Sequence, residues 1–209
     1  MAYGFLIELR INHLQNSYKI SMLKKFNTKD LIVIALLAGL YVAFALAGAI
    51  LQTILEFPMA SAIINIFISS AVVVLTCLII KKFGAAILML LIYSVVAIPL
   101  PVLGTPGFLP KVIIGLIAGL IADSIYNIFK RNEKVTSIII GSAVQIAMGF
   151  MILGFGYLFS IPNLEKVIGL FLSPLIIIAT IIIGGFSGYL GYFIYQKIKN
   201  KAFIKQLQS

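Results

Sequence analysis

Charged residues are scarce in this sequence. Only 11% of its 209 residues are Asp, Glu, Lys or Arg, against roughly 25% in an ordinary soluble domain, so a soluble globule with a polar coat is excluded. Histidine and cysteine occur once each. Cys77 cannot form an intramolecular disulfide, and because it lies in an apolar run we expect it to pack as a small hydrophobe. His13 lies outside the apolar runs, which excludes a histidine-based metal site within them.

Catalytic motifs are also lacking. The sequence contains no Gly-x-x-x-x-Gly-Lys-Ser/Thr phosphate loop, so the chain cannot hydrolyse ATP by the usual apparatus. No two acidic residues fall within one apolar run, and a carboxylate pair would have to assemble from different segments. The sequence therefore predicts a protein that is not an enzyme and that carries no cofactor or metal.

Long apolar runs dominate what is present. Hydrophobic residues make up 62% of the chain, and its mean hydropathy is +1.15. A helix that crosses the bilayer core needs about 20 apolar residues, and six runs qualify. The sequence predicts an all-α integral membrane protein, a bundle of six transmembrane helices. Their expected ranges are 31–51, 59–80, 83–103, 108–129, 135–159 and 167–195, with Pro99 and Pro101 kinking or ending the third.

The positions of the basic residues predict the orientation. The net charge of +10 does not indicate a nucleic-acid partner, because the basic residues punctuate the apolar runs instead of forming one patch. Of the 16 Lys and Arg residues, 14 fall on one side of the predicted helices, and only Lys111 and Lys166 fall on the other. Cytoplasmic loops retain basic residues, so we expect both termini in the cytoplasm. The predicted domains are a cytoplasmic segment 1–30, a membrane domain 31–195 and a basic tail 196–209; residues 1–21 read either as an extension before a start at Met22 or as part of the natural chain.

Two charges lie within one predicted span. Lys111 and Asp123 are 12 residues apart, about 18 Å along a helix, so they cannot pair with each other. Lys111 either meets a solute from the bundle interior or extends to the external headgroups. Asp123 either meets interfacial water and the basic residues after it or contacts a cytoplasmic partner. Small residues share a stripe with Lys111 and predict a helix contact: Gly115, Ala118, Gly119 and Ala122.

Polar and aromatic residues near the outer side form the candidate solute site. Asn65 and Gln145 lie within predicted spans, where each serves either an interhelical hydrogen bond or a solute. The loop residues Glu56 and Asn163 add polar groups, and aromatic side chains could line the site. The predicted solute-binding residues are Lys111, Glu56, Asn65, Tyr93, Gln145, Tyr157 and Asn163. The lysine favours a solute with a carboxylate, phosphate or carbonyl.

Small residues recur every four positions on the first predicted helix. Ala35, Gly39 and Ala43 form a ladder that lets another helix approach closely. The ladder either packs inside the bundle or docks another protein. The glycines of the last predicted helix favour internal packing: Gly184, Gly185, Gly188 and Gly191.

These features together resemble the substrate-binding S components of energy-coupling factor (ECF) transporters. The resemblance covers about Lys24 to Lys199 and rests on the six helices, the basic start running into Thr28-Lys29-Asp30-Leu31, the ladder, and the turn Leu103-Gly104-Thr105-Pro106-Gly107-Phe108. It implies a subunit in the prokaryotic plasma membrane that captures a vitamin or similar micronutrient from outside. Delivery inward would require a transmembrane coupling protein and two ATP-binding subunits. The family's Ala-xxx-Ala contact with the coupling protein maps onto Ala35, Gly39 and Ala43, with glycine in place of the middle alanine.

Two other classes of function remain open at this point. A stand-alone secondary transporter would show the same topology, but it should work without an ATPase and present a coupling-ion or proton relay. A membrane assembly protein would account for the small-residue ladders but would bind no small solute.

Overall fold

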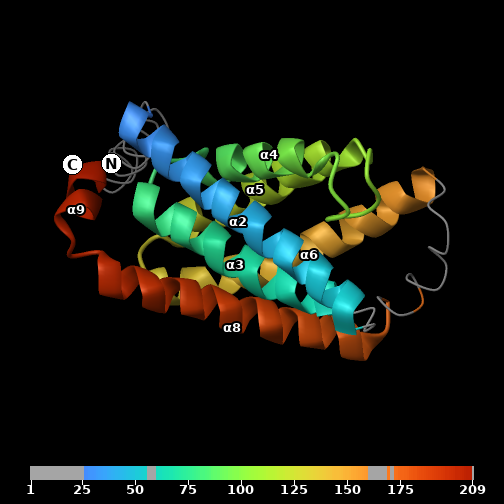
Figure 1. The fold of residues 1–209 in the computed structure, drawn as a ribbon. Coiled ribbons are helices and arrows are strands. Elements are labelled where there is room, and N and C mark those ends of the chain that lie inside the picture. The colour runs from blue at the N-terminus through green and yellow to red at the C-terminus, as the bar shows by residue number, and fades with distance from the viewer. Residues whose placement is uncertain (1–25, 56–59, 160–168, 170–171, 209) are drawn as a thin grey trace, which may run out of the picture.

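The chain folds into long helices that run along a common direction (Figure 1). A computed structural model describes residues 26–55, 60–159, 169 and 172–208. Within these ranges the regular structure is entirely helical. The elements are α2 (Thr28–Leu55), α3 (Ala60–Ile80), α4 (Ala85–Ala97), α5 (Pro110–Phe129), α6 (Glu133–Leu158), α8 (Pro174–Ile198) and α9 (Ala202–Gln208).

Five of these helices, α2, α3, α5, α6 and α8, are long and apolar enough to cross a bilayer. Many of their large apolar side chains face outward, including Leu36 on α2 and Ile182 on α8, as expected where lipid replaces water. The chain is therefore an all-α, multi-pass membrane protein. The predicted third span is the exception, because α4 has only 13 residues, about 20 Å of helix. It ends before Pro99 and Pro101, since neither proline has an amide hydrogen to continue the helix.

The bundle is held by close helix crossings at glycine. A Cβ added to Gly141 on α6 would lie 2.2 Å from the carbonyl oxygen of Gly184 on α8, and one added to Gly188 would lie 2.2 Å from that of Ser137. Only hydrogen can occupy these positions, so α6 and α8 pack backbone against backbone. On the same face of α8, a Cβ on Gly191 would lie 2.7 Å from the carbonyl oxygen of Ala71 on α3. These contacts confirm internal packing for the glycines of α8, and Cys77 is buried as expected.

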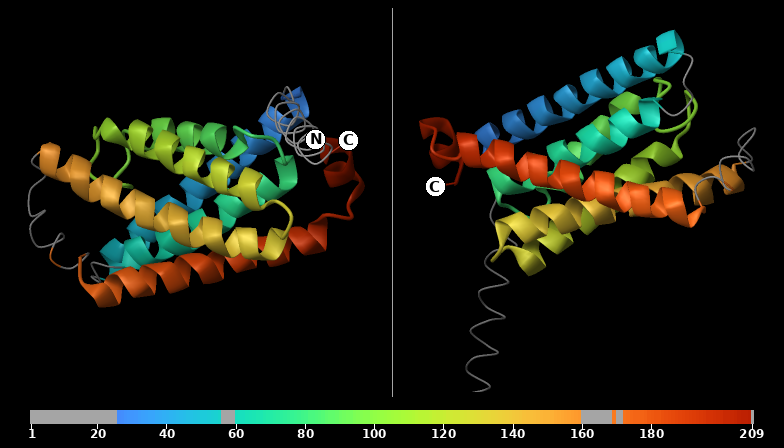
Figure 2. Two further views of the ribbon diagram at one scale, coloured as in Figure 1. Left: turned by 180° about the vertical axis from the view of Figure 1, so that it is seen from behind. Right: turned by 90° about the horizontal axis from the view of Figure 1, so that it is seen from below.

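Charged pairs join the elements at one end of the bundle. The start of α2 and helix α9 lie at this end (Figure 1), as do the α3–α4 and α5–α6 connections (Figure 2). The Lys82 ammonium lies 2.5 Å from the Asp30 carboxylate, and the pair is buried. The partly exposed Lys81 lies 2.8 Å from Glu133 at the start of α6. The two ion pairs at this end therefore join the α3–α4 connection to the starts of α2 and α6.

Candidate solute-binding site

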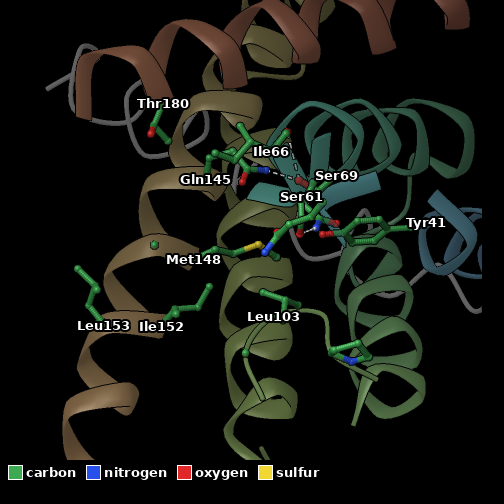
Figure 3. A pocket seen from close by; sticks show the side chains of 15 residues that line it. Tyr41, Ser61, Ile66, Ser69, Leu103, Gln145, Met148, Ile152, Leu153 and Thr180 are labelled. Carbon is green, nitrogen blue, oxygen red and sulfur yellow. Dashed lines mark hydrogen bonds between the residues drawn. The ribbon is translucent and has the colours of Figure 1, made fainter. Parts of the chain in front are cut away.

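A cavity of about 410 Å³ lies between four helices and the α4–α5 connection. Its volume falls in the range of ordinary small-molecule sites, about 300–1,000 Å³. The connection contributes Pro101, Leu103 and Gly104, which places the cavity toward the end of the bundle opposite α9 (Figures 1 and 3). The other lining residues are Tyr41, Gln52, Ser61, Asn65, Ile66, Ser69, Gln145, Met148, Gly149, Ile152, Leu153 and Thr180.

Gln145 links α6 to α3 at the cavity wall. Its Nε2 donates to the hydroxyl oxygens of Ser69 and, at 2.9 Å, of Ser70; the bond to Ser69 is drawn in Figure 3. The interhelical hydrogen bond expected from the sequence is therefore present. Gln145 also lines the cavity, so it can make the interhelical hydrogen bond and still face a solute.

Asn65 brings a second carboxamide to the cavity. Its Nδ2 donates to the Ser61 hydroxyl over 3.4 Å, within α3. Its Oδ1 is buried and has no hydrogen-bond partner in the described part of the chain. An unpaired buried acceptor costs about 1–3 kcal/mol. This cost would be relieved by a molecule in the cavity that donates a hydrogen bond.

Tyr93 supports the cavity wall from behind. Its ring stacks on Tyr41, with centroids 3.7 Å apart and planes inclined by 14°. Tyr93 is fully buried, and it is Tyr41, from α2, that lines the cavity. Tyr93 on α4 therefore positions the ring that faces the cavity.

Lys111 and Asp123 have one shared role, which neither sequence interpretation anticipated. The fully buried Lys111 donates from Nζ to the carbonyl oxygens of Ala97 and Leu100, at 2.9 and 2.8 Å, where α4 ends. The Asp123 carboxylate accepts from the backbone N–H groups of Gly84, Ala86 and Ile87, at 3.0–3.3 Å, where α4 begins. The cation meets the negative end of the helix dipole and the anion meets the positive end. The 12-residue separation of Lys111 and Asp123 on α5 matches the length of α4, so the two side chains bind the two ends of α4. We call this pair of contacts the clamp.

The small residues between the two charges explain how α5 comes so close. A Cβ on Gly115 would lie 2.0 Å from the Ser94 hydroxyl oxygen, and one on Gly119 would lie 2.5 Å from the Ile87 Cα. The predicted helix contact is therefore confirmed, with α4 as the partner. Lys111 is not among the described residues that line the cavity.

Among the other predicted solute-binding residues that the structure describes, Tyr157 does not line the cavity. Tyr157 is 75% exposed near the end of α6. Glu56 and Asn163 lie outside the described residues. The main residues that sequence reasoning missed are Tyr41, Gln52, Ser61, Ser69, Met148 and Thr180. One signal could have found some of them: Ser61, Asn65 and Ser69 follow each other at four-residue spacing, which puts a polar stripe on an otherwise apolar helix.

The ladder of α2 faces away from the bundle. Ala35, Gly39 and Ala43 are all exposed, and a Cβ added to Gly39 would meet nothing within 4 Å. The opposite face of α2 is buried through Ile34, Ala38, Tyr41 and Ala45. Of the two uses weighed from the sequence, internal packing is therefore wrong for the described bundle, and the small residues form an open surface.

Comparison with family models, curated proteins and solved structures gives no match.

Proposed function

We propose that this chain is the membrane-embedded solute-binding subunit of an ECF-type importer, which captures a vitamin-like micronutrient from outside. The observation that carries the proposal is the combination of a small-molecule cavity near one end of the bundle with an exposed small-residue ladder on α2. The first feature fits a solute, and the second fits a helix of a coupling protein that can approach the backbone closely.

The cavity supports solute binding over a purely structural role. The half-open cavity of about 410 Å³ is lined by apolar side chains and a few polar groups, which is the composition typical of small-molecule sites. The described lining residues include no Asp, Glu, Lys, Arg or His. A proton-coupled secondary transporter should present titratable relay residues, so this lining favours a subunit that takes its energy from partners over a carrier of that kind.

The proposed topology has six crossings with both termini in the cytoplasm. Helix α4 would complete the sixth crossing together with the connection that follows it, since Lys111 satisfies the carbonyl oxygens where α4 ends. Cysteine labelling in a Cys77→Ser background tests this arrangement. Thr105→Cys should react in intact cells, and Arg131→Cys only after permeabilisation. Arg131 serves better than its neighbour Asn132, whose side chain caps α6 through the Val135 N–H. Labelling of Arg131→Cys in intact cells would contradict the topology.

The partner contact is tested by placing a larger side chain on the ladder. Gly39→Leu places a side chain where the fold leaves open space, so folding and solute binding should persist. Uptake and co-purification with a coupling protein and its ATP-binding subunits should both be lost. Gly154→Leu is the matched control, because Gly154 is also exposed and a Cβ there also meets nothing within 4 Å. This control on α6 should leave uptake unchanged.

Two outcomes would replace the proposal. Uptake that persists in cells lacking every coupling protein would favour the secondary transporter. Absence of any bound small molecule, together with stable association with other membrane proteins, would favour the assembly protein. Mass spectrometry of the purified, denatured protein distinguishes the second case.

A further inference from the structure

We infer that the cavity takes an uncharged solute that donates N–H or O–H hydrogen bonds, and that it rejects carboxylates and phosphates. This inference rests on the proposed function and names the chemical class of its solute. It follows from the orientation of the two carboxamides and from the residues that line the remaining wall.

The orientation of Gln145 is fixed by its serine partners. Ser69 donates its single hydroxyl hydrogen to the carbonyl oxygen of Ile66, and Ser70 donates its own to that of Gly141, each at 3.2 Å. Both hydroxyl oxygens can then only accept, so the Gln145 amino group must face them, and its two hydrogens are used. What Gln145 can offer a solute is its carbonyl oxygen Oε1, an acceptor.

Asn65 adds a further acceptor, although only one of its two amino hydrogens has a partner among the described residues. Its amino group is directed to Ser61, and its Oδ1 has no partner among the described residues. Asn65 and Gln145 both line the cavity, and each has a carboxamide oxygen for which no hydrogen bond within the described residues is given. A carboxylate or phosphate placed against these two oxygens would bring lone pairs together, and no charged group in the described lining would offset the loss of its hydration. Amide, ureide, lactam and hydroxyl groups each provide the matching hydrogen.

The positive charge that would favour an anion is used elsewhere. Lys111, the basis for expecting a carboxylate or phosphate, has its ammonium on the carbonyl oxygens of Ala97 and Leu100. Within the described lining no other cation takes its place. The remaining wall is mostly apolar and includes Ile66, Met148 and Ile152, which are labelled in Figure 3. Its other polar side chains, which include those of Gln52, Ser61 and Thr180, are uncharged. The solute should thus combine an apolar body with donors at its edge.

The test uses the full-length protein, purified in detergent and immobilised by an affinity tag. The probe is the fraction of yeast extract below about 1 kDa, stripped of protein. After washing, the protein is denatured and the released molecules are identified by mass spectrometry. Asn65→Leu and Gln145→Met each remove one acceptor. Gln196→Met is the matched control, because it removes a carboxamide on α8 that contacts Glu133 away from the cavity.

We expect the wild type and the Gln196→Met control to enrich an uncharged molecule that bears N–H or O–H donors. Each cavity variant should weaken its binding about tenfold, which corresponds to one hydrogen bond. Because two variants are used, a folding failure in one leaves the other informative. An enriched carboxylate or phosphate would overturn the inferred class while leaving the proposed function intact. Enrichment of nothing by the wild type would overturn both.

Discussion

Lys111→Met should destabilise the protein through α4. The lysine provides two short hydrogen bonds from a charged donor to Ala97 and Leu100, each worth about 1.5–3 kcal/mol. Burial of the ammonium offsets part of this gain, but methionine would leave both carbonyl oxygens unpaired at about 1–3 kcal/mol each. We expect a net loss of about 2–4 kcal/mol. For a chain of this length, that lowers Tm by about 4–16 °C.

The single cysteine provides the assay. Cys77 is buried, so a maleimide dye that fluoresces on reaction with thiols reports unfolding in detergent without a further label. Lys201→Met, an exposed change in the tail, is the control and should shift Tm by about 2 °C or less, as exposed substitutions usually do. If Lys111→Met melts with the control, the ammonium does not support α4 and the clamp is refuted.

Three further predictions address other parts of the fold. Asp123→Asn should lower Tm in the same assay, because a neutral amide accepts more weakly from the N–H groups that begin α4; an unchanged Tm would remove the other half of the clamp. Gly188→Leu should prevent folding, since its Cβ would meet the Ser137 carbonyl oxygen at 2.2 Å, whereas Gly39→Leu should fold normally. If the two variants gave similar size-exclusion profiles, Gly188 would not be packed against α6 while Gly39 is open, as the structure has them. Burial lowers the pKa of Lys81, but its bond to Glu133 and its contact with Tyr195 raise it more, so the pKa lies above its ordinary value. The pair's contribution, under about 1 kcal/mol for partly exposed groups, is therefore complete below the ordinary lysine pKa and is lost as the pH rises through the raised one. Lys81→Met should accordingly differ slightly from wild type at neutral pH and converge with it in strong alkali.

The sequence was sufficient to predict most of the helices because apolar run length is a direct physical requirement of the bilayer. Five predicted spans correspond to helices long enough to cross. The third was predicted over 83–103 with Pro99 and Pro101 kinking or ending it, and α4 does end at Ala97, just before these prolines. Hydropathy counts Ile98, Leu100 and Val102 as apolar and registers the intervening prolines only weakly. Proline geometry, not composition, ends that helix.

The site was harder to predict because position along a helix does not reveal the direction that a side chain takes in three dimensions. Lys111 and Asp123 are too far apart along the helix to pair, so the sequence predicts a separate role for each. What the sequence does not reveal is that helix α4 lies beside α5, with its C-terminal end at Lys111 and its N-terminal end at Asp123. Asn65 and Gln145 were identified because polar residues in apolar helices are costly. Tyr41 and Met148 resemble ordinary packing residues, and only the arrangement of the helices brings them to the cavity.

Helix α2 joins the two features on which the proposed function rests. Its buried face contributes Tyr41 and Gln52 to the cavity, while Gly39 and Ala43 lie exposed on its other side. Tyr41 and Gly39 are two residues apart, so they move together as parts of one rigid helix. A partner that binds the ladder and displaces α2 must therefore shift the cavity wall and the Tyr41–Tyr93 stack. If partner binding changes the affinity for the solute by some factor, linkage requires that solute binding change the affinity for the partner by the same factor. Docking and solute release in the proposed importer would then be two consequences of one helix movement.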